Sequence, residues 1–382
     1  MFRNRISFAA LFAILLFTAI HAQPQQVASV VHTRYTISST ALGEDRTILV
    51  RVPTGYERST QRFPVVVMLD AHPPQNAVMA SIIEDQANAG RMPEMILVGI
   101  QNTDRTRDLT PTKTERENTG GGDKFLDFIQ NEVLPFVEKN YRTQPYRVFA
   151  GHSLGGLTVV YTMISRPDLF NGYIAASPVL HWDKNFPINK SAEVFKTRKD
   201  WKKTLFIALG NEPDYDAGFN LYKDLLKKAD LKDFSYEFQH WMDEDHGSIV
   251  HRAYLAGMRK IFEGWQPQIP VTGVAALEDH YAKLTKRFGY EIKPPEDIVN
   301  QVGYALLRTN KLAEAVDAFE RNVKFYPDSA NVYDSLAEAH EKSGSKSKAI
   351  ANYEKAYKMA QQKGEEQLAI TAKANFDRLS SK

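Results

Sequence analysis

The sequence predicts an α/β fold with a mostly parallel central sheet, followed by an all-α region. From residue 27 to 265, short apolar runs rich in β-branched and aromatic residues alternate with segments of helical periodicity. Near-continuous apolar runs suit strands that helices cover on both faces. Residues 276–382 have a helical pattern throughout. The length of 382 residues predicts two or three units, and 43% hydrophobic with 25% charged residues is an ordinary globular mixture.

Five strands are predicted from these apolar runs, with helical patterns between them. The strands are residues 46–52 (RTILVRV), 64–69 (PVVVML), 95–100 (MILVGI), 146–150 (YRVFA) and 204–209 (TLFIAL). Apolar residues recur at helical spacing from Asp123 to Tyr141, and Pro135 is expected to kink or divide that helix.

Charge and cysteine content exclude several classes of function. The chain has 48 Lys+Arg and 46 Asp+Glu, a net charge of +2, and no basic block, which gives no support to nucleic-acid binding. It contains no cysteine, so disulfides, thiolate zinc sites and a cysteine nucleophile are excluded.

Residues 1–22 have the layout of a secretory signal peptide. Arg3 and Arg5 precede an almost wholly apolar run from Phe8 to Ile20, and Ala22 offers a small residue before polar sequence. The alternative is a membrane anchor, but the run is shorter than the roughly 20 residues that a span needs. We therefore expect an exported protein, periplasmic or secreted, with no stable membrane insertion after cleavage.

A Pro- and Gly-rich linker is predicted at residues 266–275, before tetratricopeptide-like repeats with capping helices at 276–382. Five positions recur after 34 residues, the period of paired tetratricopeptide helices. They are Val302, Gly303, Asn310, Ala315 and Phe319, which return as Leu336, Ala337, Gly344, Ala349 and Tyr353. The alternative is two ordinary amphipathic hairpins.

Residues 151–156 (GHSLGG) contain G-x-S-x-G between a predicted strand and a helix-like run. In that context the serine occupies a strained turn that exposes its hydroxyl beyond the end of the sheet. Side chains at Gly151 and Gly155 would collide with neighbouring backbone, and Gly156 lets the helix pack closely. The sequence therefore predicts Ser153 as a nucleophile; the alternative is a glycine turn without catalytic role.

A serine hydroxyl needs a neighbouring base, and in this architecture an acid and then a histidine follow the serine in the chain. His246 is the predicted base because it lies in a loop (DEDHGS) after a strand-like segment. His181 is a weaker candidate, and His240 and His251 are expected to be packed or surface residues. No metal or organic cofactor is implied.

The acid is expected just beyond a strand, where Asn211-Glu212-Pro213-Asp214 follows residues 204–210 (TLFIALG). Glu212 is the predicted acid, with Asp214 as the alternative and Asp216 as a more distant one. Its role would be to orient the His246 ring and stabilise the cationic form of that ring.

Two backbone N–H groups are expected to stabilise a developing oxyanion. One is the amide of Leu154, directly after the nucleophile. The other should come from the loop after residues 64–69, where Pro73 lacks an N–H and leaves Ala71 or His72 as the donor.

With these residues in place, the chain resembles the Putative esterase group of α/β-hydrolases. That group includes esterase D, enterochelin-type siderophore esterases, feruloyl and acetyl esterases, and mycolyltransferases. The resemblance covers about residues 30–265. It rests on GHSLGG with Ser153, Ala176-Ser177-Pro178 with Trp182 behind it, DHGS with His246, and residues 98–111 (VGIQNTDRTRDLTP).

The resemblance implies His72 as the second oxyanion donor, because relatives often carry LDG and then the donor residue. This chain departs from that pattern with Ala71 in place of the glycine. It also favours Glu212, two residues beyond a strand-ending glycine. Fusion of such an esterase to tetratricopeptide repeats is an architecture seen in the family.

The implied function is a secreted serine esterase that hydrolyses carboxylic esters through an acyl-enzyme. Siderophore-type, feruloyl or acetyl, and small acyl esters remain open, on small-molecule or glycan-linked substrates. Arg105 and Arg107 could bind an acidic substrate group, or pair with Asp104 or Asp108 to brace their loop. The alternatives are an acyltransferase with the same triad, and a catalytically silent hydrolase scaffold that binds protein partners through its repeats.

Overall fold

The computed structural model describes residues 32–58, 60–267 and 273–381. The predicted signal peptide at residues 1–22 and the middle of the predicted linker at 266–275 lie outside the described residues. Within the described ranges, no helix is both long and apolar enough to cross a membrane.

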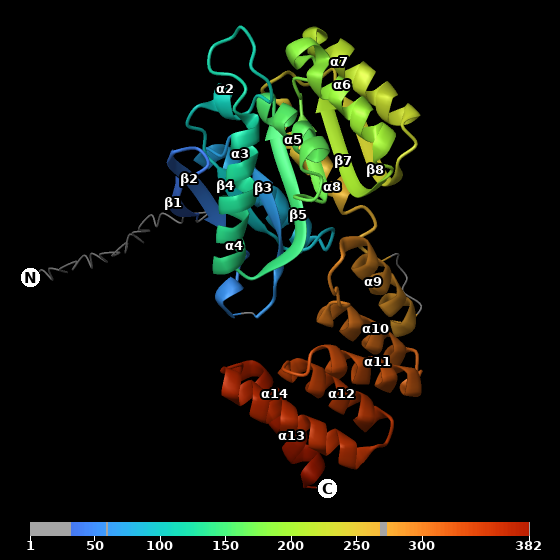
Figure 1. Ribbon diagram of the computed structural model, residues 1–382. Coiled ribbons are helices and arrows are strands. Elements are labelled where there is room, and N and C mark those ends of the chain that lie inside the picture. The colour runs from blue at the N-terminus through green and yellow to red at the C-terminus, as the bar shows by residue number, and fades with distance from the viewer. Residues whose placement is uncertain (1–31, 59, 268–272, 382) are drawn as a thin grey trace, which may run out of the picture. The chain divides into compact units, whose positions relative to one another are not determined.

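An eight-stranded sheet forms the centre of the α/β region (Figure 1). The strand order is β1-β2-β4-β3-β5-β6-β7-β8. All pairs from β4 to β8 are parallel, whereas β1 with β2 and β2 with β4 are antiparallel, which confirms the prediction of a mostly parallel sheet. The strands are β1 (Thr33–Ser39), β2 (Glu44–Arg51), β3 (Phe63–Met68), β4 (Ile96–Ile100), β5 (Thr143–His152), β6 (Gly172–Ala176), β7 (Asp200–Leu209) and β8 (Lys232–His240).

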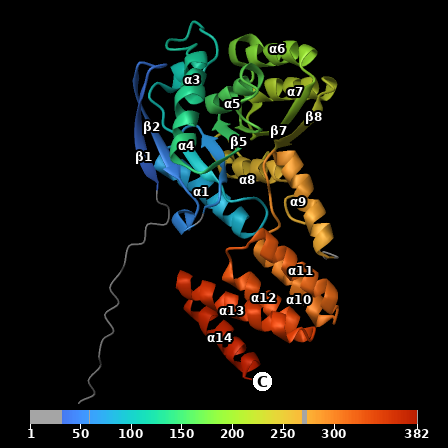
Figure 2. The same cartoon turned by 60° about the horizontal axis from the view of Figure 1, so that its bottom comes forward.

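Helices cover both faces of this sheet, as the apolar strands require. Figure 2 shows α1 and α8 on one side and α3, α5, α6 and α7 on the other. The strands β3, β4 and β6 are buried along their whole length. The helices are α1 (Pro73–Asn88), α2 (Arg105–Asp108), α3 (Gly122–Phe128), α4 (Leu134–Asn140), α5 (Leu154–Ser165), α6 (Trp182–Thr197), α7 (Pro213–Lys228) and α8 (Ile249–Ile261), with a short 3-10 turn, η1 (Tyr56–Arg58).

The helix predicted from Asp123 to Tyr141 is present and contains a π-helical turn, but it is not divided, because the residues at both junctions keep right-handed helical backbone angles. A π-helical turn, η2 (Ile129–Val133), lies between α3 and α4 and ends two residues before Pro135. Pro135 lies in the first turn of α4 and, because it lacks an N–H, cannot donate a hydrogen bond to the preceding turn.

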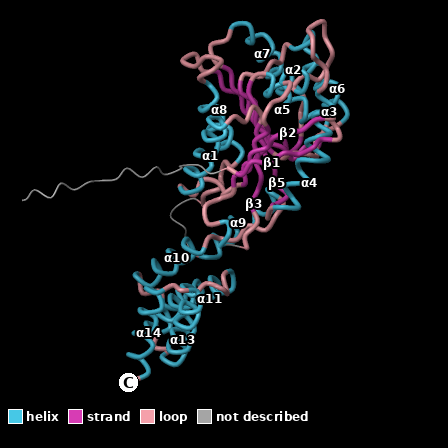
Figure 3. The backbone as a smooth tube through the Cα atoms, turned by 90° about the vertical axis from the view of Figure 1, so that its left-hand side faces the viewer, coloured by secondary structure: helices cyan, strands magenta, loops and turns pink. Residues whose placement is uncertain are grey.

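The C-terminal region is built from helices and loops (Figure 3). Two pairs of positions 34 residues apart have the same local structure. Asn310 and Gly344 both have a left-handed backbone, with φ 58° and 79°. Gly303 lies so close to Phe319 that a Cβ would come within 2.5 Å of the ring, and the positions 34 residues later, Ala337 and Tyr353, belong to one buried cluster. The helices are α9 (Val274–Phe288), α10 (Glu296–Arg308), α11 (Leu312–Phe325), α12 (Ala330–Lys342), α13 (Lys346–Lys363) and α14 (Glu366–Ser380). A tetratricopeptide assignment stays a prediction.

Candidate active site

Ser153, Glu212 and His246 all lie beyond the carboxyl ends of parallel strands. Ser153 follows β5, Glu212 follows β7, and His246 follows β8. In open α/β sheets this edge is where ligands bind. The strand order therefore gathers three predicted site residues that lie up to 93 positions apart in the chain.

Ser153 occupies a strained turn between β5 and α5. Its backbone has φ 60° and ψ −119°, a conformation that costs energy for any residue with a side chain. A Cβ on Gly151 would lie 2.4 Å from the carbonyl oxygen of Gly155, so only glycine allows the turn to close. The N–H of Ser153 donates to the carbonyl of Ala176 at 2.9 Å, which ties the turn to β6.

Glu212 and His246 are in direct contact. Nδ1 of His246 donates to Oε2 of Glu212, and the carboxylate is buried while 41% of the histidine side chain is exposed. The other carboxylate oxygen, Oε1, accepts hydrogen bonds from the hydroxyl of Ser177 and from the N–H of Gly210 at 3.1 Å. The imidazole is thus held by its Nδ1 edge, and its Nε2 edge is left to act as a base.

Local sequence explains how the His246 loop is held. The Asp245 carboxylate accepts from the amides of Gly247 and Ser248, both at 2.8 Å, which forms an Asx turn around His246. These two bonds lower the pKa of Asp245. A Cβ on Gly210 would lie 2.8 Å from the carbonyl of Glu244, so the glycine lets the acid loop approach the histidine loop.

The competing candidates lie elsewhere. Asp214 is exposed in the first turn of α7. His240 donates from Nε2 to the carbonyl of Gly210 at 3.0 Å and lies 3.5 Å from Asp216. His181 and His251 are exposed. Among these candidates in the described residues, only Glu212 and His246 form a hydrogen-bonded pair in which the carboxylate is buried.

The two predicted oxyanion donors differ in their surroundings. Leu154 is the first residue of α5, so its N–H has no carbonyl within the helix and points from a helix N-terminus. The N–H of His72 instead donates to the carbonyl of Asp70 at 2.8 Å. The N–H of Ala71 donates to the carbonyl of Ile100 at 3.1 Å. In this structure the His72 amide is engaged within its own loop, and its role as the second oxyanion donor stays a prediction.

Arg105 is paired inside the protein. Its guanidinium donates to both oxygens of Asp70, at 2.6 and 2.9 Å, and to the carbonyl of His152 at 3.1 Å. Asn102 donates to the same carboxylate at 2.6 Å. The hydrogen bond to Asp70 raises the pKa of Arg105. This network ties the loop after β3 to the residue before Ser153; the partner of Arg105 is Asp70, not Asp104 or Asp108, which the sequence offered.

Arg107 is paired as well. Its guanidinium contacts Glu44 at 2.6 Å and Asp108 at 2.7 Å. Asp108 is buried and also binds Arg46 at 2.5 Å. The alternative in which Arg107 braces its loop through Asp108 therefore matches its contacts in this structure, and substrate binding by either arginine stays a prediction.

Replacing Arg105 by alanine distinguishes a role in bracing the loop from a role in binding an acidic substrate group. We expect the free energy of unfolding to fall by about 1–2 kcal/mol, because Asp70 loses a bidentate partner that is itself partly exposed. If the role is bracing, kcat/KM falls by the same factor for p-nitrophenyl acetate and for the anionic p-nitrophenyl hemisuccinate. Urea unfolding and esterase assays measure both. A selective loss for the anionic ester would instead show that Arg105 binds a substrate carboxylate.

Sequence reasoning missed Tyr215 and His152. The Tyr215 side chain lies near Ser153, and its ring centroid lies 5.3 Å from that of His246. The His152 ring centroid lies 4.5 Å from that of His246. Burial and the charge of Glu212 raise the pKa of Tyr215, and burial above all lowers the pKa of His152 to about 4. The only sequence signal for either residue is its position beside a predicted site residue.

The lowered pKa of His152 predicts that the free energy of unfolding depends on pH. Its pKa is about 6.5 in the unfolded chain and about 4 in the folded one, so between these values the unfolded state binds more protons. The free energy of unfolding therefore falls by about 3 kcal/mol as the pH falls from 6.5 to 4. His152→Gln should reduce the loss of stability between pH 7 and pH 4 in urea unfolding. The exposed His251→Gln should keep it, and equal losses in all three proteins would contradict the expectation.

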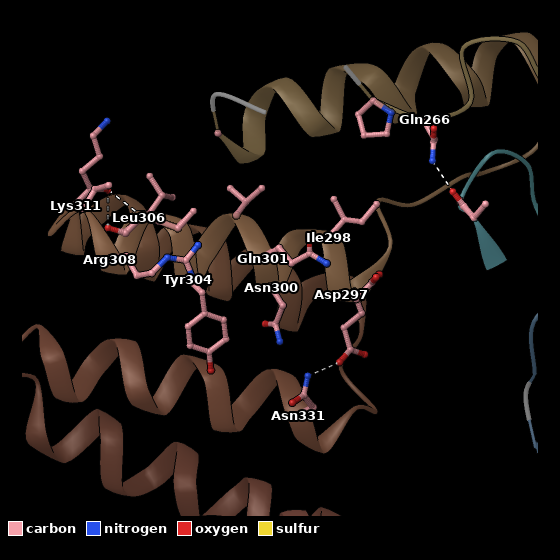
Figure 4. A pocket seen from close by; sticks show the side chains of 18 of the residues that line it. Gln266, Asp297, Ile298, Asn300, Gln301, Tyr304, Leu306, Arg308, Lys311 and Asn331 are labelled. Atoms are coloured by element: carbon pink, nitrogen blue, oxygen red, sulfur yellow. Dashed lines mark hydrogen bonds between the residues drawn. The ribbon is translucent and has the colours of Figure 1, made fainter. Parts of the chain in front are cut away.

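A separate hollow of about 1280 Å³ is lined largely by α10 and residues next to it (Figure 4). Asn300, Tyr304 and Arg308 of α10 and Asn331 of α12 contribute polar side chains. Ser153, Glu212 and His246 do not line it. It is therefore not the space in which the candidate catalytic residues meet.

Two relatives of this chain are named as siderophore esterases. Over 154 residues the chain is 33% identical to ferri-bacillibactin esterase BesA of Bacillus subtilis, which covers 34% of this chain and 52% of that protein. Over 190 residues it is 34% identical to the siderophore triacetylfusarinine C esterase of Aspergillus fumigatus, which covers 42% and 65%. The chain thus spans about half to two thirds of the length of these curated relatives.

Solved structures agree with the fold. An IroE-like serine hydrolase from Shewanella oneidensis matches with a TM-score of 0.69 and 28% identity over 78% of this chain and all of that one. An uncharacterised protein from Capnocytophaga ochracea matches with a TM-score of 0.66 over 92% of this chain and all of that one; at 17% identity this shows the fold alone. The model of the Putative esterase family matches residues 39–210, so the α/β region that carries Ser153 is esterase-like.

Proposed function

We propose that the protein is a serine esterase in which Ser153, His246 and Glu212 form the catalytic triad. The observation that carries the proposal is the contact of His246 with buried Glu212, beside a serine on a strained strand-to-helix turn. The named esterases among the relatives support ester hydrolysis. These residues have the chemistry that the reaction needs, which argues against a silent scaffold.

In the proposed mechanism Oγ of Ser153 attacks the ester carbonyl carbon while Nε2 of His246 takes the hydroxyl proton. Glu212 keeps the ring in the required tautomer and stabilises the imidazolium. The N–H of Leu154 stabilises the oxyanion.

The tetrahedral intermediate then collapses, and the leaving alkoxide takes the proton from His246. This leaves an acyl-enzyme on Ser153. Water attacks the acyl carbon, gives its proton to His246, and releases the acid as Ser153 recovers its proton. A second oxyanion donor from the loop after β3 requires the N–H of His72 to turn from the carbonyl of Asp70 towards the substrate.

For the substrate we propose a siderophore-type ester, because two relatives are named as esterases of ferri-bacillibactin and of triacetylfusarinine C. Feruloyl, acetyl and small acyl esters are the alternatives to be compared. We also propose that the protein is exported through residues 1–22. An N-terminus beginning at about residue 23 on protein recovered outside the cytoplasm would support this, and an intact leader there would oppose it.

The test begins with the wild-type chain and a fluorophosphonate probe. Labelling at Ser153, located by mass spectrometry, is the expected result. Turnover is then compared on ferri-bacillibactin, triacetylfusarinine C, methyl ferulate and p-nitrophenyl acetate. No labelling of folded protein would overturn the proposal, and acyl transfer to an added alcohol in preference to water would replace hydrolase with acyltransferase.

A further inference from the structure

Ser177 occupies an unusual position directly after β6. Its side chain is fully buried, and its backbone has φ 42°, in the left-handed region that side chains disfavour. The following residue is Pro178, which restricts the serine backbone further. The N–H of Ser177 donates to the carbonyl of Ala208 in β7 at 2.8 Å. Such strain persists where the surrounding structure over-determines the conformation, often at functional sites.

The strained backbone directs the Ser177 hydroxyl to Glu212. That hydroxyl donates to Oε1 of the carboxylate, which also accepts from the N–H of Gly210 at 3.1 Å. Oε2 accepts from His246. Because two donors from the protein interior occupy one oxygen, the carboxylate presents its other oxygen to the imidazole. The two donors also stabilise the negative charge of a buried group.

The same turn holds the nucleophile. The carbonyl of Ala176, one residue before Ser177, accepts from the N–H of Ser153 at 2.9 Å. Gly156 of α5 lies against this turn, since a Cβ there would come within 3.0 Å of the Ala176 oxygen and of Cα in Pro178. Ala176 and Ser177 thus connect the backbone of Ser153 to the side chain of Glu212.

We propose that Ser177 is a positioning residue of the active site: its hydroxyl fixes the orientation in which the Glu212 carboxylate meets His246, and the backbone at φ 42° directs that hydroxyl to the carboxylate. The inference rests on the proposed triad and extends it by a fourth residue, which acts through Glu212 and touches no reacting atom.

Ser177→Gly and Ser177→Ala test the inference together. Both remove the hydroxyl, but glycine adopts a positive φ without strain whereas alanine does not. We expect both variants to lose about 10- to 100-fold in kcat for p-nitrophenyl acetate with little change in KM. We expect Ser177→Gly to unfold at a higher urea concentration than Ser177→Ala. Activity that recovers together with stability in the glycine variant would overturn the inference.

Ser191→Ala is the matched control. Ser191 is also fully buried, but its hydroxyl donates to the carbonyl of Pro187 within α6, away from Glu212. We expect wild-type turnover from this variant. In a Glu212→Gln background, Ser177→Gly should cost less than a further twofold, because the residue acts through the carboxylate. A full multiplicative loss would show a general disturbance of the site and overturn the inference.

A spectroscopic readout keeps this inference separate from the proposed function. The low-field proton resonance of Nδ1–H in His246 reports its bond to Glu212 and does not require turnover. It should shift or broaden in Ser177→Gly and remain unchanged in Ser191→Ala. If the wild type is not labelled by the fluorophosphonate, the proposed function fails; if it is labelled and Ser177→Gly keeps its resonance and its turnover, only the role of Ser177 fails.

Discussion

Ser153→Ala is expected to lower kcat for p-nitrophenyl acetate by about a million-fold, the scale of losing the nucleophile of a serine triad. Covalent labelling by a fluorophosphonate should disappear, because no hydroxyl remains to form the adduct. The fold should persist, since alanine keeps a Cβ at the same strained backbone position, with φ 60°. The unfolding midpoint in urea checks this directly.

Ser165→Ala, at the end of the helix that follows Ser153, provides the control. Its hydroxyl donates to the carbonyl of Tyr161 at 2.7 Å, at the far end of α5 from Ser153. Labelling and turnover should match the wild type. Residual turnover of Ser153→Ala within tenfold of the wild type would show that another group is the nucleophile, and the proposed mechanism would be wrong.

Glu212→Gln is expected to lower kcat by about ten thousand-fold while leaving the fold intact. A glutamine cannot provide two acceptor oxygens at once, so it either fails to accept from Nδ1 of His246 or loses its bonds with Ser177 and Gly210. The imidazole then adopts the wrong tautomer or orientation to take the proton of Ser153. Single-turnover acylation with p-nitrophenyl acetate isolates this step.

Asp214→Asn and Asp216→Asn are the matched controls, because both carboxylates lie in the first turn of the helix that follows Glu212. We expect turnover within about twofold of the wild type, as for most surface substitutions away from a site. If Asp214→Asn produced the large loss and Glu212→Gln did not, Asp214 would be the acid and the mechanism would need a different loop arrangement.

The strands that could be predicted from sequence are those with a strong local signal. Residues 64–69 and 95–100 are apolar throughout, and they form the fully buried strands β3 and β4. Two strands gave no such signal. β1 (Thr33–Ser39) lies at the sheet edge with mostly polar residues, and β6 (Gly172–Ala176) has five residues, three of them glycine or alanine. Their strand structure depends on the neighbours they pair with.

The turn at Ser153 could also be predicted, because its geometry is a property of the local chain. Gly151 and Gly155 approach each other to 2.4 Å between an ideal Cβ and the carbonyl oxygen, and this contact spans only four residues. The pairing of Arg105 could not be predicted in the same way. Its partner Asp70 lies 35 positions away on a different loop, and the sequence offered Asp104 and Asp108 as nearer choices.

By itself, the sequence determined the α/β architecture, the strained serine turn and a short set of candidate acids and bases. Each of these depends on apolar periodicity or glycine spacing within a few residues. Tertiary structure alone decided that Glu212 meets His246, that Ser177 supports the pair, and that both arginines are already neutralised. Those contacts join loops at the ends of separate strands, and the order in which strands stand in the sheet brings them together.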